Sequence, residues 1–264
     1  MIRVDQNHPC PVCEKGRWCA FTEDGEYVAC KRVSEGSITN LGQFGYLHKL
    51  NSTMDLQGLT KNDRPIVDWK SLQQTYKFQL STLRKHPPLG FKANTYTEYF
   101  CGWNGKGWTF PVWNERMAIC GMQVRYPDGT KCSVTGTKIG VFIPQSITSA
   151  IKSILCITEG LTDSMVSTEF GLPAMGKWNC DSTHEIALSL VLERIQPSRV
   201  IIVSDNDDPG KKGAKELYNM IKTYNSGLHT TGVIPPEGIK DLRDWKNKGL
   251  TREEFYKFCK IKLT

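Results

Sequence analysis

Carboxylates follow two predicted strands in the second half of the chain. Glu159 comes directly after the short apolar run 154–158, and Asp205 and Asp207 follow the β-branched run at 199–204. In open parallel sheets, functional groups collect outside the carboxyl ends of the strands, so we expect these acids to lie together. Carboxylates this close repel one another unless protons or cations neutralise them, and hard oxygen ligands suit Mg²⁺ or Mn²⁺. Such a site can bridge phosphates and stabilise an in-line displacement.

Two lysines extend this acidic site. Lys211 and Lys212 begin the helix predicted from about Gly210 to Tyr224 and add positive charge beside the acids, where an anionic cofactor or substrate would bind. The alternative is that the acids only cap helices and face solvent. Their coincidence with strand ends, in chain order, favours the metal site.

A second group of chemical residues lies near the N-terminus, where four of the ten cysteines occur, at Cys10, Cys13, Cys19 and Cys30. A Cys-x-x-Cys turn opposite a hairpin with one cysteine on each arm can ligate Zn²⁺ tetrahedrally. A segment with so little core would need that metal to fold. His8 is the alternative to Cys19 as fourth ligand, and buried structural cysteines are the alternative to a metal site. The remaining six cysteines are expected to be small buried apolar residues.

Length and composition limit the classes of protein to which this chain can belong. The chain has 264 residues, which suggests about two domains, and its net charge of +7 suits a polyanionic partner. The N-terminus has no apolar signal segment and no run is long enough to span a membrane, so we expect a cytoplasmic protein with reduced thiols.

The elements that must position these residues change along the chain. Residues 1–50 are turn-rich, 51–65 read as a polar linker and 66–90 read as a helix ended by two prolines. Short β-type runs with glycines fill 91–150. From 151 to 236, strands are predicted at about 154–158, 173–175, 199–204 and 229–234. Helices alternate with them: one over 161–170, one that begins at a capping box at 182–185 and runs to Ile195, and one over 210–224. This order predicts βαβ units and a mainly parallel sheet, and Thr251 is expected to cap a last helix.

Three segments in this second half resemble known motifs. Residues 157–163 (ITEGLTD) resemble the TOPRIM glutamate motif, and 205–210 (DNDDPG) resemble its D-x-D-x-x-G motif. Residues 240–244 (KDLRD) resemble the K-D-x-x-D/E stretch that follows the TOPRIM core in phage primase-helicases. The resemblance implies that Glu159, Asp205 and Asp207 coordinate the catalytic metals, with Asp163 and Asp241 supporting them.

The first half also resembles primases. Residues 1–50 are similar to the zinc-binding domain of bacterial and phage primases, but Lys31-Arg32-Val33 follows Cys30 where those domains usually have a second Cys-x-x-Cys pair. Residues 91–145 are similar to the basic subdomain that precedes TOPRIM. This resemblance implies a nucleic-acid groove that contains Arg125, Lys131 and Lys138. Trp103 or Trp108 would offer stacking surfaces there, and the alternative is that both tryptophans belong to the core.

Together these resemblances imply a DNA primase with an α/β fold. It would have a zinc-ribbon-like domain (1–50), a linker (51–65), a mixed basic subdomain (66–150), a TOPRIM domain (151–236) and a C-terminal segment and helix (237–264). Such an enzyme makes RNA or DNA primers from nucleoside triphosphates on single-stranded DNA. It needs structural Zn²⁺ and catalytic Mg²⁺ or Mn²⁺, and works with a separate replicative helicase in a bacterial cell or phage-infected host. The alternatives are a TOPRIM nuclease and a non-catalytic zinc-dependent protein that binds single-stranded DNA.

Overall fold

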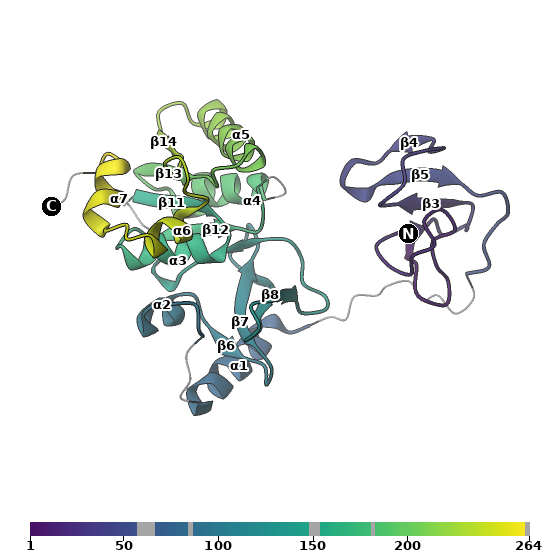
Figure 1. Cartoon of the computed structure of the whole chain (residues 1–264), viewed down its shortest axis with the longest axis horizontal. Helices are drawn as coiled ribbons and strands as arrows, with labels where there is room; N and C mark the ends of the chain where they lie inside the picture. The colour runs from purple at the N-terminus through teal and green to yellow at the C-terminus, as the bar shows by residue number, and fades with distance from the viewer. Residues whose placement is uncertain (57–66, 84–86, 148–153, 181–182, 262–264) are drawn as a thin grey trace. The chain divides into compact units, whose positions relative to one another are not determined.

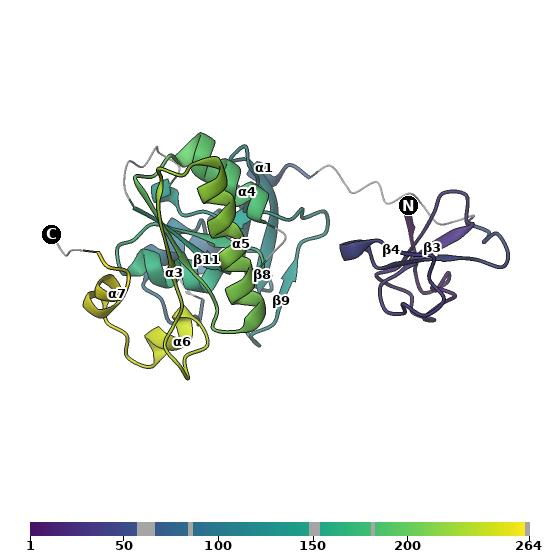
Figure 2. The same ribbon diagram turned by 90° about the horizontal axis from the view of Figure 1, so that it is seen from above.

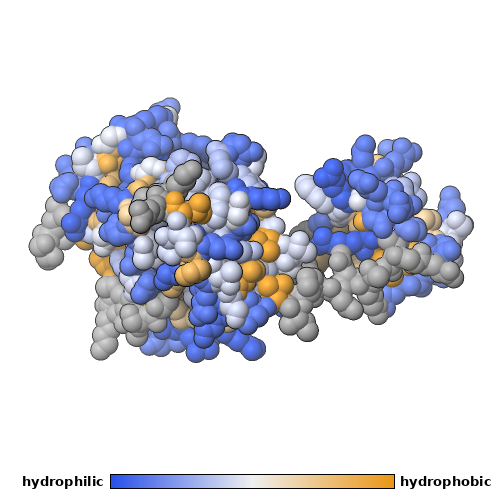
Figure 3. All heavy atoms as spheres, turned by 90° about the horizontal axis from the view of Figure 1, so that it is seen from below, coloured by the Kyte–Doolittle hydropathy of each residue, from blue (hydrophilic) through white to orange (hydrophobic). Residues whose placement is uncertain are grey.

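The computed structural model describes residues 1–56, 67–83, 87–147, 154–180 and 183–261. The chain forms two compact units, Met1–Pro65 and Ile66–Thr264, and each is described by itself. Within the described residues, no helix combines the length and the apolar character that crossing a membrane requires. The face seen in Figure 3 is mostly hydrophilic, with apolar residues in smaller groups.

The N-terminal unit is a small antiparallel sheet with the order β1-β2-β3-β5-β4 (Figure 1). Its strands are β1 (Ile2–Arg3), β2 (Ala20–Phe21), β3 (Tyr27–Cys30), β4 (Thr39–Asn40) and β5 (Tyr46–Lys49), with a 3-10 turn at Gly42–Phe44. Among the described residues of this unit few apolar side chains are buried, and three of them are cysteines. The predicted linker does not begin at residue 51, because Met54 and Leu56 pack against this core. The backbone N–H of Met54 also donates to the carbonyl of Gly25 (3.0 Å).

The second unit is built on one nine-stranded sheet with the order β14-β13-β11-β12-β10-β7-β8-β9, and β6 pairs with β7. Strands β14, β13, β11 and β12 are parallel, and the others are antiparallel. The predicted parallel sheet and the predicted mixed β region therefore share one sheet, joined through β10. The strands are β6 (Gly102–Trp103), β7 (Trp108–Trp113), β8 (Ile119–Arg125), β9 (Lys131–Ser133), β10 (Val141–Phe142), β11 (Ile154–Glu159), β12 (Ala174–Lys177), β13 (Arg199–Val203) and β14 (His229–Val233).

Helices cover both faces of the parallel strands (Figure 2). On β11 and β13 alternate residues enter different cores: Leu155 and Ile157 pack with α4, α5 and the π-helical turn, whereas Cys156 and Ile201 pack with α3, α6 and α7. This double burial is why both runs are continuously apolar. The helices are α1 (Trp69–Leu83), α2 (Ala93–Glu98), α3 (Leu161–Glu169), α4 (His184–Ser189), α5 (Asp208–Tyr224), α6 (Leu242–Asn247) and α7 (Arg252–Phe258), with a 3-10 turn at Gln145–Ile147 and a π-helical turn at Leu190–Ile195.

Several local predictions were wrong. The helix predicted over 66–90 ends at Leu83 in its described part, and residues 87–90 are not helical. The helix predicted to run to Ile195 is α-helical only to Ser189, after which its hydrogen bonding widens to a π-turn. Its N-cap is Thr183, whose side chain makes no capping hydrogen bond, while the predicted cap Ser182 lies outside the described residues. The capping box at Thr251 is confirmed.

Candidate catalytic and zinc sites

The four N-terminal cysteines converge on one point. Their sulfur atoms all lie within 4.8 Å of one another, at Cys10, Cys13, Cys19 and Cys30. All are buried except Cys13, which is half-buried. His8 is not part of this cluster, and its Nδ1 lies 3.1 Å from Asp5 Oδ1. The convergent set is therefore the all-cysteine one, which is the donor chemistry of structural zinc.

Hydrogen-bond donors surround the sulfur atoms. The backbone N–H of Lys31 donates to Cys19 Sγ (3.4 Å), and that of Arg32 donates to Cys30 Sγ (3.5 Å). Arg32 Nη1 lies 3.6 Å from Cys13 Sγ and 3.7 Å from Cys19 Sγ. Burial opposes ionisation of Cys13, but hydrogen bonds from the Lys15 backbone, from Cys19 and from Arg32 outweigh it and lower the pKa of the thiol to about 7. At Cys13 these donors favour the thiolate form that binds metal.

The acidic site forms where β11 and β13 end. The two strands are parallel and in register, with Thr158 beside Val203, so Glu159 and the residues after Val203 leave the sheet at the same edge. Burial, followed by repulsion from Glu159 and then from Asp241 and Asp207, raises the pKa of Asp205 to about 7. The acids named from the sequence thus act on one another electrostatically. A divalent cation bound at this edge would offset the repulsion between the acids.

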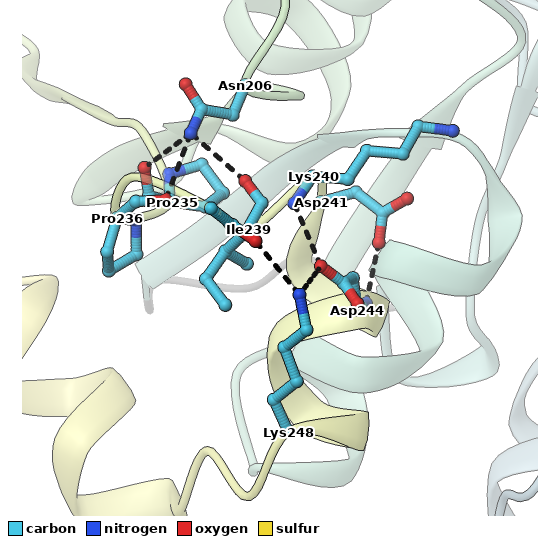
Figure 4. Close-up of polar contacts among 9 residues, drawn as sticks. Asn206, Pro235, Pro236, Ile239, Lys240, Asp241, Asp244 and Lys248 are labelled. Carbon is cyan, nitrogen blue, oxygen red and sulfur yellow. Dashed lines mark hydrogen bonds and ion pairs between the residues drawn. The ribbon is translucent and has the colours of Figure 1, made fainter.

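Asn206 fastens a distant loop to this edge (Figure 4). Its backbone N–H donates to the carbonyl of Lys240 (2.7 Å). Its Nδ2 donates to three further carbonyls, those of Pro235 (3.2 Å), Pro236 (3.0 Å) and Ile239 (3.0 Å). These bonds bring Asp241, the next residue along, to the acidic site. Sequence analysis missed this role of Asn206, although an amide between two acids was a visible signal.

Two more acids hold helices at the same place. Asp241 is the N-cap of α6, and its Oδ1 accepts from the backbone N–H of Asp244 (2.7 Å). Asp163 in α3 is buried, and its Oδ1 accepts from the backbone N–H of Arg243 (2.8 Å). Burial, followed by repulsion from Asp241 and Asp205, raises the pKa of Asp163 well above its ordinary range. Asp163 therefore couples α6 to the acidic site.

Asp207 lies at the surface and also caps a helix. It is exposed, and its Oδ1 accepts from the backbone N–H of Gly210 (2.8 Å), which makes it the N-cap of α5. A Cβ on Gly210 would lie 2.9 Å from the Asp205 carbonyl oxygen, so the turn requires glycine there. Of the two lysines that follow, Lys211 is half-buried and Lys212 is exposed, with its Nζ 3.9 Å from Glu216 Oε1.

The carboxylates are more dispersed than the cysteines. Within the described residues, no three of them bring their oxygen atoms as close together as the four sulfur atoms lie. A buried lysine that sequence analysis missed stands beside them. Lys177 ends β12, pairs in register with Glu159, and its Nζ donates to the Cys180 carbonyl (2.6 Å) and lies 3.1 Å from His184 Nε2. A lysine that closes an apolar strand was its only sequence signal.

The basic residues of the β region differ in exposure. Lys131 and Lys138 are exposed, whereas Arg125 is half-buried and its Nε donates to Gln123 Oε1 (2.9 Å). Burial and then repulsion from Arg243 lower the pKa of Arg125, while attraction to Asp163 opposes this shift. Charges near the acidic site therefore act on Arg125.

The proposed stacking role is wrong for Trp108. This side chain is buried in the core, and its ring packs edge-on against that of half-buried Trp103, with 5.1 Å between the ring centroids. The cysteine prediction also fails in part, because Cys132 is exposed and Cys180 is half-buried, whereas Cys101, Cys120, Cys156 and Cys259 are buried.

Comparison with known proteins supports the fold. No protein-family profile and no curated protein matches the sequence. Among solved structures, the DnaG primase catalytic domain bound to single-stranded DNA is similar, with a TM-score of 0.57 and 15% identity over 72% of this chain and 78% of that one. The zinc-binding and RNA polymerase domains of Aquifex aeolicus primase have a TM-score of 0.55 and 16% identity over 78% of this chain and 63% of that one.

The primase fragment of the bacteriophage T7 primase-helicase protein is also similar, with a TM-score of 0.50 and 16% identity over 64% of this chain and 71% of that one. At these identities the similarity is one of fold. The predicted fold class, a zinc-type module with an α/β domain of the primase kind, is confirmed.

Proposed function

We propose that the protein is a DNA primase that synthesises short primers on single-stranded DNA. The observation that carries the proposal is the meeting of acids from three chain segments at one sheet edge, where burial and then mutual repulsion raise the pKa of Asp205 to about 7. Glu159, Asp205 and Asp207 would hold Mg²⁺ or Mn²⁺. Bound metal would neutralise the triphosphate and lower the barrier to attack by a 3′-hydroxyl.

The remaining acids orient this group. Asp163 and Asp241 act as positioning residues, because both hold the N-terminal end of α6 by accepting from backbone N–H groups, at 2.8 Å and 2.7 Å. Lys211 and Lys212, the fourth and fifth residues of α5, would attract the phosphates of the incoming nucleotide.

The other parts would handle the nucleic acid. Zinc held by Cys10, Cys13, Cys19 and Cys30 would fold the module that contacts the template. Arg125, Lys131 and Lys138 would hold the template–primer hybrid through phosphates, which position the hybrid without reading its sequence. Cytoplasmic replication of a phage or mobile element, with a separate helicase, belongs to the same proposal.

Primer synthesis tests the proposal directly. Purified protein is incubated with varied single-stranded templates, labelled ribo- or deoxynucleotides, and Mg²⁺ or Mn²⁺, and oligonucleotide products are separated by length. We expect metal-dependent oligonucleotides from the wild type and none from Asp205→Asn. Cleavage of the DNA without synthesis would instead assign the acidic site to a nuclease. If the protein binds DNA but neither synthesises primers nor cleaves DNA, it is a non-catalytic binding protein.

A further inference from the structure

Trp18 is exposed in a way that the other tryptophans are not. All seven tryptophans lie within the described residues, and Trp18 alone is exposed, at 69%. Its backbone φ is +77°, in the left-handed region that a bulky residue rarely adopts. Such a conformation costs free energy and persists only where the surrounding structure imposes it. Neither the zinc site nor the small core of the unit uses this ring.

Arg32 holds the Trp18 ring from one side. Its guanidinium lies over the ring, 5.6 Å from the centroid. The same guanidinium donates to the Arg17 carbonyl (3.0 Å) and to Cys13 Sγ and Cys19 Sγ. The cation behind the ring is therefore fastened to the sulfur cluster. A ring fixed in this way loses little further freedom when a ligand stacks on it.

We propose that Trp18 is a stacking platform for an unpaired nucleobase of single-stranded DNA, an inference that rests on the proposed function and names one contact of the N-terminal unit with the template. A planar aromatic ring on the surface suits a nucleobase, because every base has a π-face. The ring is flanked by exposed cations, Arg17 beside it in sequence and Arg32 against it, which suit the adjoining phosphates. Trp and Arg are also enriched in protein–protein interfaces, so a protein partner is the alternative that an unchanged affinity for oligo-dT would favour.

The overall charge of the unit indicates which contact dominates. Residues 1–56 hold six Lys and Arg against seven Asp and Glu, a balance of 6 − 7 = −1. Three of these acids, Glu23, Asp24 and Glu26, lie in the turn between β2 and β3. General attraction to phosphates is therefore weak in this unit. Stacking on Trp18 should supply a part of the affinity that salt does not screen.

The test removes the ring while keeping the backbone. Glycine accepts a φ of +77°, so Trp18→Gly should fold at least as stably as the wild type and keep its zinc. We expect it to raise the Kd for a 20-nucleotide oligo-dT about tenfold, with no change in the slope of log affinity against log salt and no change in affinity for duplex DNA. Trp18→Tyr should retain most of the binding. Tyr224→Ala removes a ring of the same 69% exposure at the end of α5 and should change nothing.

Two results would overturn the inference: an unchanged Kd for oligo-dT, or an equal loss for single strands and duplex with a shallower salt slope, which would mean a phosphate contact. If Trp18→Gly lost zinc or melted early, Trp18→Asn, which also tolerates the left-handed region, would take its place. Primer synthesis separates this inference from the proposed function. If the wild type synthesises primers and Trp18→Gly binds oligo-dT as tightly as the wild type, the stacking platform alone is refuted. If the wild type makes no primers but Trp18→Gly binds oligo-dT more weakly, the primase proposal is refuted and the platform stands.

Discussion

Asp163 in α3 and Arg243 in α6 are joined by a 2.8 Å hydrogen bond from the Arg243 backbone N–H, across 80 residues of sequence. Asp163 is buried, so α6 is docked by a carboxylate whose own charge is disfavoured. Asparagine offers the same acceptor without the charge, whereas alanine leaves the buried N–H without its partner.

We therefore expect Asp163→Asn to keep or raise the melting temperature of the metal-free protein. Asp163→Ala should lower the free energy of unfolding by about 1–3 kcal/mol. Thermal unfolding of both variants measures the difference, with Asp208→Asn, an exposed acid in the first turn of α5, as the control. Equal stability of the two Asp163 variants would contradict the docking role.

Asp205 and Asp207 should separate catalysis from stability. Asp205→Asn removes a charge that burial and then repulsion from neighbouring acids disfavour, so the metal-free protein should melt at the same or a higher temperature. Asp207→Asn keeps a side-chain oxygen for the cap on Gly210 and should also leave stability unchanged, whereas Asp207→Ala should cost about 1 kcal/mol. Both asparagine variants should lose primer synthesis by orders of magnitude and keep single-stranded DNA binding. If the variants still synthesise primers but are less stable, these acids serve only as helix caps.

The stability of the metal-free protein should depend on pH through Asp205. Its pKa rises from an ordinary 3.8 to about 7 on folding, so the folded protein holds a proton that the unfolded chain releases. This contribution to stability is complete below about pH 4 and is lost as the pH rises through about 7. We expect the melting temperature of the wild type to fall relative to that of Asp205→Asn between pH 5 and about pH 8. A millimolar divalent cation should remove the difference, and parallel curves without metal would contradict the prediction.

The sulfur cluster should hold one zinc ion. Elemental analysis should find one Zn²⁺ per chain in the wild type, none in Cys13→Ser, and one in Cys132→Ser, whose thiol is exposed and lies outside the cluster. Chelation should unfold the N-terminal unit, because its few buried side chains cannot replace the metal. A folded unit without metal, seen as protection of its amides from hydrogen exchange, would overturn the assignment.

Phosphate contacts should appear as salt dependence. Affinity for single-stranded DNA should fall steeply with salt, and Lys131→Glu should lower both the affinity and the slope, because the side chain is exposed on β9. Lys257→Glu, a reversal of an exposed charge in the last turn of α7, is the control and should have little effect. A salt-independent affinity would exclude a groove that tracks phosphates.

Features that depend on near neighbours in the chain could be predicted from the sequence. The apolar runs before Glu159 and Asp205 identified two strands, and chain order placed their ends on one edge. The spacing of the four cysteines likewise named the cluster in which the sulfur atoms meet. Strand periodicity and ligand spacing are local, and the right-handed βαβ connection leaves parallel strands little freedom in where they end.

The features that depend on packing between distant segments of the chain could only be seen in the tertiary structure. Nothing next to Asn206 in sequence shows that its amide would meet the carbonyls of Pro235, Pro236 and Ile239. The tryptophans show the same limit, since Trp108 is buried and Trp18 is exposed although the first begins β7 and the second lies two residues before β2. Burial depends on which surfaces the fold brings together, and those surfaces come from segments far apart in the chain. The sequence by itself therefore determined which residue types could do chemistry and the order of strands and helices along the chain, and the fold decided which side chains face one another and which face solvent.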